Sequence, residues 1–179
     1  VISCMALLNA YSSFRFKSFY GNVYNMLTRL VDTYSISLQI GSIQKAVENY
    51  AHSGSKDYIQ NYETDFDELE KLIDRLRADT EGDEYYVFGD IRNMVVSFDE
   101  ECKYVIKLYD SKVQPIYTNE SVSTTIRLKG YIEDEVKNML VGQLGAIMTY
   151  YKKFLNDIRS QENLTYFLIA LITIFCIIM

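Results

Sequence analysis

The stretch from Glu63 to Glu84 is strongly acidic, with ten carboxylates and three basic side chains, and its residue types could bind a cation. Carboxylates presented from a loop are calcium ligands, and they would also attract a cationic peptide. The loop donors would be Asp79, Glu81, Asp83 and Glu84. Their spacing lacks the alternating acids, glycine and distant glutamate of a calcium-binding loop. We therefore favour a solvated acidic helix face and loop, at the end of the molecule far from a membrane.

Catalytic constellations are missing from the sequence. His52 is the only histidine, in the turn-like stretch His52-Ser-Gly-Ser55, whereas a di-iron helical bundle needs paired Glu-x-x-His elements. No glycine-rich phosphate loop occurs. Cys4, Cys102 and Cys176 have the spacing of neither a metal site nor a disulfide framework. The sequence predicts no catalytic, cofactor-binding or metal-binding residue and no cofactor in this segment, and the ligand-binding residues stay unknown.

Tyrosine is the dominant aromatic residue, with 16 Tyr and no Trp. Tyrosine combines stacking with hydrogen bonding, which suits a pocket for a small molecule or a sugar. Many of these tyrosines fall on apolar helical stripes, where core packing is the simpler explanation. We predict that role for Tyr20, Tyr24, Tyr34, Tyr62, Tyr109 and Tyr151.

The charge of the chain is confined to its middle. No charged residue precedes Arg15 or follows Glu162, and the net charge is -6. A bilayer crossing needs about 20 apolar residues, so residues 163–179 are predicted to start a second transmembrane helix that the chain truncates. Residues 1–10 are predicted to end a first one, with a signal-peptide remnant or a buried helix start as alternatives. Residues 11–162 would then be extracytoplasmic, and a pI near 4.9 argues against nucleic acid as a partner.

Four apolar stripes with three- and four-residue spacing predict an all-α protein. The chain has one proline, Pro115, and few segments alternate as strands do. The stripes are Tyr20, Tyr24, Leu27, Val31, Tyr34, Leu38, continuing loosely through Ile43, Val47, Tyr50; Tyr62, Phe66, Leu69, Ile73, Leu76; Phe88, Ile91, Val95, Phe98, Cys102, Val105, Tyr109; and Ile132, Val136, Leu140, Leu144, Ile147, Tyr151, Phe154, Ile158. An antiparallel four-helix bundle of long helices brings both chain ends to one pole, where both could enter a membrane.

Two further features concern the fourth helix. It meets no helix breaker before Leu164, so we expect it to continue into the second span. Gly142, Gly145 and Ala146 form a patch of small residues that permits close backbone approach. The patch fits a dimer seam or a sliding helix, and it equally fits local packing inside one bundle.

This layout resembles the input half of bacterial two-component sensor histidine kinases. The resemblance rests on the stripe from Tyr20 to Leu38 leaving one span and on Leu140 to Ile158 running into Leu164 to Met179. It implies an extracytoplasmic signal-sensing domain whose kinase activity and phosphoacceptor histidine lie beyond Met179. We expect a homodimer in the membrane with an unknown small-molecule or peptide ligand. A chemoreceptor ligand-binding domain and a membrane-anchored helical binding or scaffolding protein are the alternatives.

Overall fold

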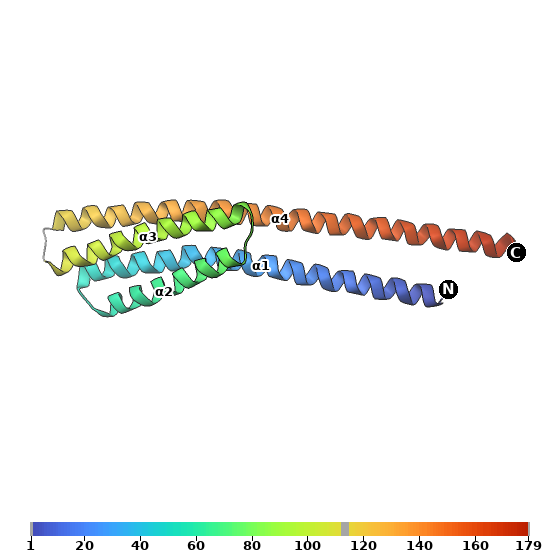
Figure 1. Cartoon of the computed structure of the whole chain (residues 1–179), viewed down its shortest axis with the longest axis horizontal. Coiled ribbons are helices and arrows are strands. Elements are labelled where there is room, and N and C mark those ends of the chain that lie inside the picture. The colour runs from blue at the N-terminus through green and yellow to red at the C-terminus, as the bar shows by residue number, and fades with distance from the viewer. Residues whose placement is uncertain (1, 112–114, 179) are drawn as a thin grey trace. The chain divides into compact units, whose positions relative to one another are not determined.

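The structure is a computed structural model that describes the backbone of residues 2–111 and 115–178. Its side chains are described over residues 10–111, 119–167 and 169–170. Four helices follow one another along the chain: α1 (Ile2–Ser53), α2 (Asp57–Ala78), α3 (Asp83–Asp110) and α4 (Pro115–Ile178) (Figure 1). No strand occurs in the described backbone. The prediction of an all-α helical bundle is therefore confirmed.

The chain forms two compact units. Leu27–Gly142 make up one unit, and Val1–Met26 together with Gln143–Met179 make up the other. The first of these, called the bundle unit below, contains nearly all of the buried apolar side chains, and Phe19 is the buried apolar residue outside it among the described ones. The second, called the terminal unit, contains parts of α1 and α4.

Two of the four predicted stripes form the centre of the bundle unit. On α3, every stripe residue from Phe88 to Val105 is no more than 1% exposed. On α2, Tyr62, Leu69, Ile73 and Leu76 are buried, and Phe66 packs against them half-buried. Because each of these helices has one apolar face, the spacing of the apolar residues was enough to identify the face that packs.

The first predicted stripe faces the core only in its continuation, where Ile43, Val47 and Tyr50 are at most 4% exposed. Tyr20, Tyr24, Leu27, Val31, Tyr34 and Leu38 are all between 46% and 70% exposed. Beside Ile43 and Val47, the core is lined by residues of α1 outside the predicted stripe, namely Ile36, Ile40 and Ala46. The prediction was wrong for the stretch from Tyr20 to Leu38 because α1 has two apolar faces, and regular spacing alone does not tell which of them the neighbouring helices cover.

The fourth stripe divides between the two units. Ile132 and Val136 are fully buried in the bundle unit. Further along α4, Leu144 and Tyr151 are about half exposed, and Phe154 is half-buried. Core packing is thus wrong for Tyr20, Tyr24, Tyr34 and Tyr151, is confirmed for Tyr62, and holds partly for Tyr109.

A buried polar layer joins α1 to α4 inside the bundle unit. The Gln44 Nε2 amide donates to Thr125 Oγ1 at 2.9 Å and to Glu48 Oε1 at 3.0 Å. The Thr125 hydroxyl in turn donates to the Val122 carbonyl at 2.8 Å. Gln44 is 4% exposed and Thr125 is fully buried. Polar groups at such depth cost free energy unless they are paired, so this layer favours one alignment of the two helices.

A glycine with positive φ begins the connection after α1, and another ends the connection before α3. Gly54 (φ 69°) follows α1, and a Cβ there would lie 2.7 Å from the Tyr109 hydroxyl, so both conformation and space require glycine. Gly82 (φ 66°) precedes α3. The last helix, α4, begins at Pro115, where the fixed φ of proline suits the first helical position.

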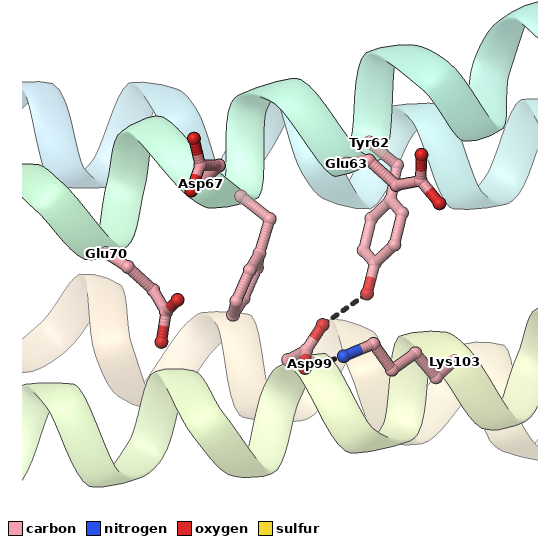
Figure 2. A pocket seen from close by; sticks show the side chains of 7 residues that line it. Tyr62, Glu63, Asp67, Glu70, Asp99 and Lys103 are labelled. Atoms are coloured by element: carbon pink, nitrogen blue, oxygen red, sulfur yellow. Dashed lines mark hydrogen bonds and ion pairs between the residues drawn. The ribbon is translucent and has the colours of Figure 1, made fainter.

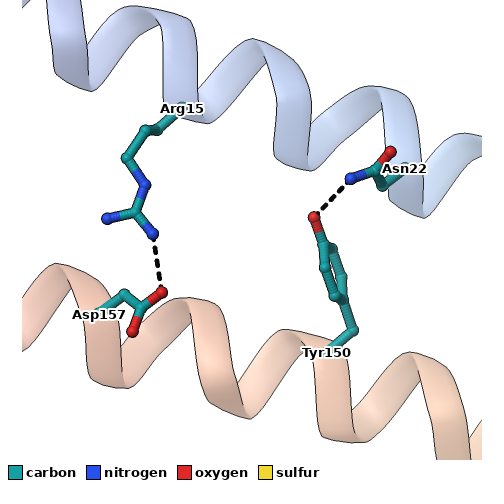
Figure 3. Close-up of polar contacts among 4 residues, drawn as sticks. All are labelled: Arg15, Asn22, Tyr150 and Asp157. Atoms are coloured by element: carbon teal, nitrogen blue, oxygen red, sulfur yellow. Dashed lines mark hydrogen bonds and ion pairs between the residues drawn. The ribbon is translucent and has the colours of Figure 1, made fainter.

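The terminal unit pairs α1 with α4 through aromatic and charged contacts. The Phe19 and Phe154 rings stack with centroids 3.8 Å apart, and Phe19 is 8% exposed. Figure 3 shows Arg15 in an ion pair with Asp157 at 2.7 Å, and the Asn22 amide donating to the Tyr150 hydroxyl at 2.7 Å. The earlier residue on α1, Arg15, thus contacts the later residue on α4, Asp157, and the later Asn22 contacts the earlier Tyr150.

Membrane spans were predicted at residues 1–10 and 163–179, and most of their side chains lie outside the described residues. Over the described part of the chain, no helix combines the length and the apolar character that a membrane crossing needs. The prediction that the last helix runs on without a break agrees with α4, which is one helix from Pro115 to Ile178.

Candidate functional site

A pocket between α2 and α3 is the best candidate for a functional site in the described structure. Its volume is about 260 Å³. It lies in the bundle unit and is open to solvent, and Figure 2 shows the side chains that line it. Its lining consists of Tyr62, Glu63, Phe66, Asp67 and Glu70 from α2 with Asp99 and Lys103 from α3.

Helical spacing places these side chains together. Tyr62 and Phe66 are four residues apart on α2, and Asp99 and Lys103 are four apart on α3, so each pair lies on one helix face. The two aromatic ring centroids are 6.2 Å apart. The Lys103 Nζ lies 6.0 Å from the centroid of the Phe66 ring. The pocket therefore has an aromatic wall from one helix and a charged wall from the other.

A buried carboxylate, Asp99, stands at the centre of the pocket. It is 7% exposed, and it accepts a hydrogen bond from the Tyr62 hydroxyl, which is 4% exposed. Its other oxygen accepts from the Lys103 Nζ at 2.7 Å (Figure 2). Two donors, one of them charged, stabilise an anion that would otherwise be costly to bury.

The same contacts shift the pKa of both donors. Burial, followed by the hydrogen bond to Asp99, raises the pKa of the Tyr62 hydroxyl well above its ordinary value. The hydrogen bond to Asp99 also raises the pKa of Lys103. Tyr62 is therefore a neutral donor and Lys103 a cation at neutral pH, and neither is poised to exchange protons as an acid–base catalyst near pH 7.

The charge of the pocket favours cations. Four carboxylates line it, from Glu63, Asp67, Glu70 and Asp99, and Lys103 is the one cation among the lining residues. Asp67 already pairs with Lys71 at 2.5 Å, so Glu63 and Glu70 are the carboxylates of α2 that an ammonium group would approach. The neighbouring Cys102 is fully buried, and burial raises the pKa of its thiol, so it is not a nucleophile. The arrangement suits binding and offers no chemistry.

The acidic loop singled out in the sequence is a separate feature. Asp79, Glu81 and Asp83 are exposed, as expected of a solvated loop. Glu84 pairs with Arg29 at 2.5 Å, which places the loop beside the part of α1 that opens the bundle unit. The loop's expected distance from a membrane stays a prediction. In the described residues, no group of three carboxylate, cysteine or histidine side chains could hold a metal ion.

The remaining sequence candidates do not join the pocket. His52 is exposed in the last turn of α1, where its Nδ1 lies 2.7 Å from the Glu48 carbonyl oxygen. Gly142, Gly145 and Ala146 are exposed, and a Cβ at either glycine would meet no described atom within 4 Å, which disfavours close packing inside the bundle. The side chains of Cys4 and Cys176 lie outside the described residues. The pocket was not predicted from the sequence. The pattern that could have indicated it is the four-residue spacing of Tyr62 and Phe66 on one helix and of Asp99 and Lys103 on the next.

Comparison with known proteins identifies the fold. No protein-family model matches the chain, and no curated protein matches it. A solved structure described as the periplasmic sensor domain of a sensor histidine kinase superposes with a TM-score of 0.69 and 12% identity, covering 77% of this chain and 96% of that one. A chain of the solved XylFII-LytSN complex gives a TM-score of 0.63 with 18% identity, covering 66% of this chain and 98% of the other. The architectural resemblance found in the sequence is thereby confirmed: this chain has the helical fold seen in a sensor histidine kinase's periplasmic sensor domain.

Proposed function

We propose that residues 11–162 are the extracytoplasmic signal-sensing domain of a membrane-anchored sensor histidine kinase, acting in two-component signal transduction. The observation that carries the proposal is the match of 77% of the chain to a periplasmic sensor domain of such a kinase. The site supports the same reading, since it offers a binding pocket without catalytic groups. In this proposal the bundle is antiparallel, residues 1–10 and 163–179 belong to two membrane spans, and the receptor works as a homodimer. Kinase activity belongs to a part of the receptor outside this chain.

The route of the signal in this proposal is α4. It is one helix from Pro115 to Ile178, and a continuous helix transmits rotation or axial displacement along its length. The stretch from Gln143 to Asn163 is wholly helical. Output should therefore depend on the helical phase of this stretch.

An insertion series in the full-length receptor tests the proposal. One residue added after Arg159 rotates the following helix by about 100° and should bias or invert autophosphorylation in membrane vesicles. A Gly-Gly pair at the same place should uncouple output from the input domain, because glycine weakens a helix. The matched control is Gly-Gly inserted between Gly54 and Ser55, in the connection between α1 and α2, which leaves the phase of α4 unchanged. Wild-type output in every variant would contradict the proposal and favour an anchored scaffold.

The location of the domain is tested by cysteine labelling in intact cells. Tyr86 is 70% exposed, so Tyr86→Cys should react with a membrane-impermeant maleimide if the bundle is extracytoplasmic. Cys102 is fully buried and serves as the unreactive internal control. Labelling that requires cell lysis would contradict the extracytoplasmic assignment.

A further inference from the structure

The charges that line the pocket between α2 and α3 do not cancel. Of its four carboxylates, Asp67 and Asp99 are each paired with a lysine four residues further along the same helix, at 2.5 Å and 2.7 Å. Glu63 and Glu70 form no hydrogen bond or ion pair within the described part of the chain. Two carboxylates of the pocket are therefore available to a cation from outside.

Helical spacing places Glu63 and Glu70 on one side of α2. Seven residues are close to two full turns, so the two positions differ by about 10 Å along the helix axis and by only about 20° around it. Phe66 lies between them in the sequence, is half-buried, and lines the same pocket. The pocket thus has an unpaired carboxylate toward each end and an aromatic ring between the two.

The side chain of Lys103 shows that an alkylammonium group fits this pocket. Its Nζ donates to Asp99 at 2.7 Å and lies 6.0 Å from the centroid of the Phe66 ring. The Lys103 side chain is 64% exposed, so its ammonium group reaches the buried carboxylate from the solvent side. A carboxylate and an aromatic face together form a favourable environment for a cation. A ligand with the same end group would meet Glu63 and Glu70 in addition.

We propose that this pocket binds a linear aliphatic polyamine, with its terminal ammonium groups at Glu63 and Glu70 and its methylene chain against the Phe66 ring. A metal ion would not serve both carboxylates at once, because its oxygen ligands lie within about 2.6 Å of it, whereas the two residues are about 10 Å apart along α2. The proposal names the ligand of the sensing domain and thus rests on the proposed function, but binding can be measured without any signalling output.

The exposure of the site sets the expected strength. Glu63 is exposed and Glu70 is half-buried, and ion pairs in contact with solvent are individually weak. Two ammonium groups on one chain strengthen each other, because binding of the first raises the effective concentration of the second. We therefore expect a Kd in the micromolar to millimolar range that rises with added salt.

Isothermal titration calorimetry of the 179-residue chain in uncharged detergent micelles tests the two-point contact. The probes are diaminooctane and diaminobutane, which carry the same two charges and differ in length. Diaminooctane should bind severalfold more tightly, because only the longer chain reaches from Glu63 to Glu70. Equal Kd values for the two diamines would overturn the proposal, since they would show that only charge is recognised.

Charge-neutral variants test the two carboxylates. Glu63→Gln with Glu70→Gln should raise the Kd for diaminooctane about tenfold, because two partly exposed ion pairs are lost. The matched control is Glu68→Gln with Asp90→Asn, which makes the same change in net charge at exposed positions outside the pocket lining. It should leave the Kd nearly unchanged. An equal rise in both double variants would show diffuse attraction to an acidic protein and would overturn the proposal.

Lys103 provides a test in the opposite direction. Lys103→Met removes the cation that the pocket already holds and opens Asp99 to the ligand, so diaminooctane should bind severalfold more tightly. A variant that merely loosened the fold would not gain affinity, and its melting temperature checks the fold separately. An unchanged or higher Kd in a folded variant would show that the ligand does not enter this pocket.

A signalling measurement separates this proposal from the proposed function. Autophosphorylation of the full-length receptor in membrane vesicles should change when diaminooctane is added, and the change should be lost in Glu63→Gln with Glu70→Gln. Binding at the pocket without any change in output would count against the proposed function alone. Absence of binding, with the expected results in the α4 insertion series, would count against the polyamine site alone.

Discussion

Asp99 shows how much a single buried residue can determine in this protein. It joins α3 to α2 through the Tyr62 hydroxyl, and Lys103 from its own helix shields it from the solvent side. A buried acceptor that loses its donor costs about 1–3 kcal/mol. Tyr62→Phe should therefore lower the free energy of unfolding by about that amount in a urea titration. The control is Tyr86→Phe, since Tyr86 is 70% exposed; an equal loss in both variants would mean that the buried bond contributes nothing.

Alkaline pH should destabilise the protein through its buried tyrosines. The hydrogen bond to Asp110, with burial, raises the pKa of Tyr50 to about 12, and the pKa of Tyr62 is raised as well. A raised pKa stabilises the fold fully below the unfolded value of 10.0, and this contribution is lost as pH rises toward the folded value. The melting temperature should fall above pH 10, and less steeply in Tyr50→Phe. An identical slope in the variant would exclude Tyr50 as the cause.

Phe98 tests the choice of core face on α3. It is fully buried, and truncating a buried phenylalanine costs roughly 3–5 kcal/mol. Phe98→Ala should therefore unfold at much lower denaturant concentration than the parent. Phe14→Ala, at a 72% exposed position, is the matched control and should change the free energy of unfolding by less than about 0.5 kcal/mol. A small effect at Phe98 would mean that the core lies elsewhere.

At the scale of helices, the acidic connection between α2 and α3 should not respond to calcium. Asp79, Glu81 and Asp83 are exposed and do not converge on one point in the described structure. Because only selective binding to the folded state raises stability, millimolar calcium should leave the melting temperature unchanged. A rise that disappears in Asp79→Asn with Asp83→Asn would reveal a cation site.

Helices with one apolar face could be predicted from the sequence, and α1 shows where such prediction stops. On α2 and α3 the spaced apolar residues are the buried ones. On α1 the exposed part of the predicted stripe, from Tyr20 to Leu38, has large, regular side chains, whereas the core face includes the polar residues Thr33 and Gln44. Burial of Gln44 depends on a partner contributed by another segment, Thr125. The pocket escaped prediction for the same reason, because its lining depends on how α2 and α3 align.

For the whole molecule, the distribution of buried side chains predicts an autonomous folding unit. Apart from Phe19, the buried apolar residues in the described part of the chain lie within Leu27–Gly142. A fragment of residues 27–142 should therefore remain helical and melt cooperatively by circular dichroism, since a domain needs its own core to fold alone. The contrasting mixture of peptides 10–26 and 143–162 should stay largely unfolded in water, because short isolated helices are marginal. A non-cooperative melt of the fragment would show that the terminal segments are needed for folding.

The hydrogen-bonded layer between α1 and α4 limits the mechanical travel of the bundle unit. Gln44 holds Thr125 at 2.9 Å in a buried position. Sliding α4 by one turn, about 5.4 Å, would pull the two side chains apart and break the buried hydrogen bond that joins the two helices. A shift of about 1 Å, or a small rotation, keeps them within hydrogen-bonding reach. Any axial displacement of α4 along α1 in this unit should therefore be short. A longer displacement should require apolar residues in place of Gln44 and Thr125, because apolar side chains have no hydrogen bond that favours one position.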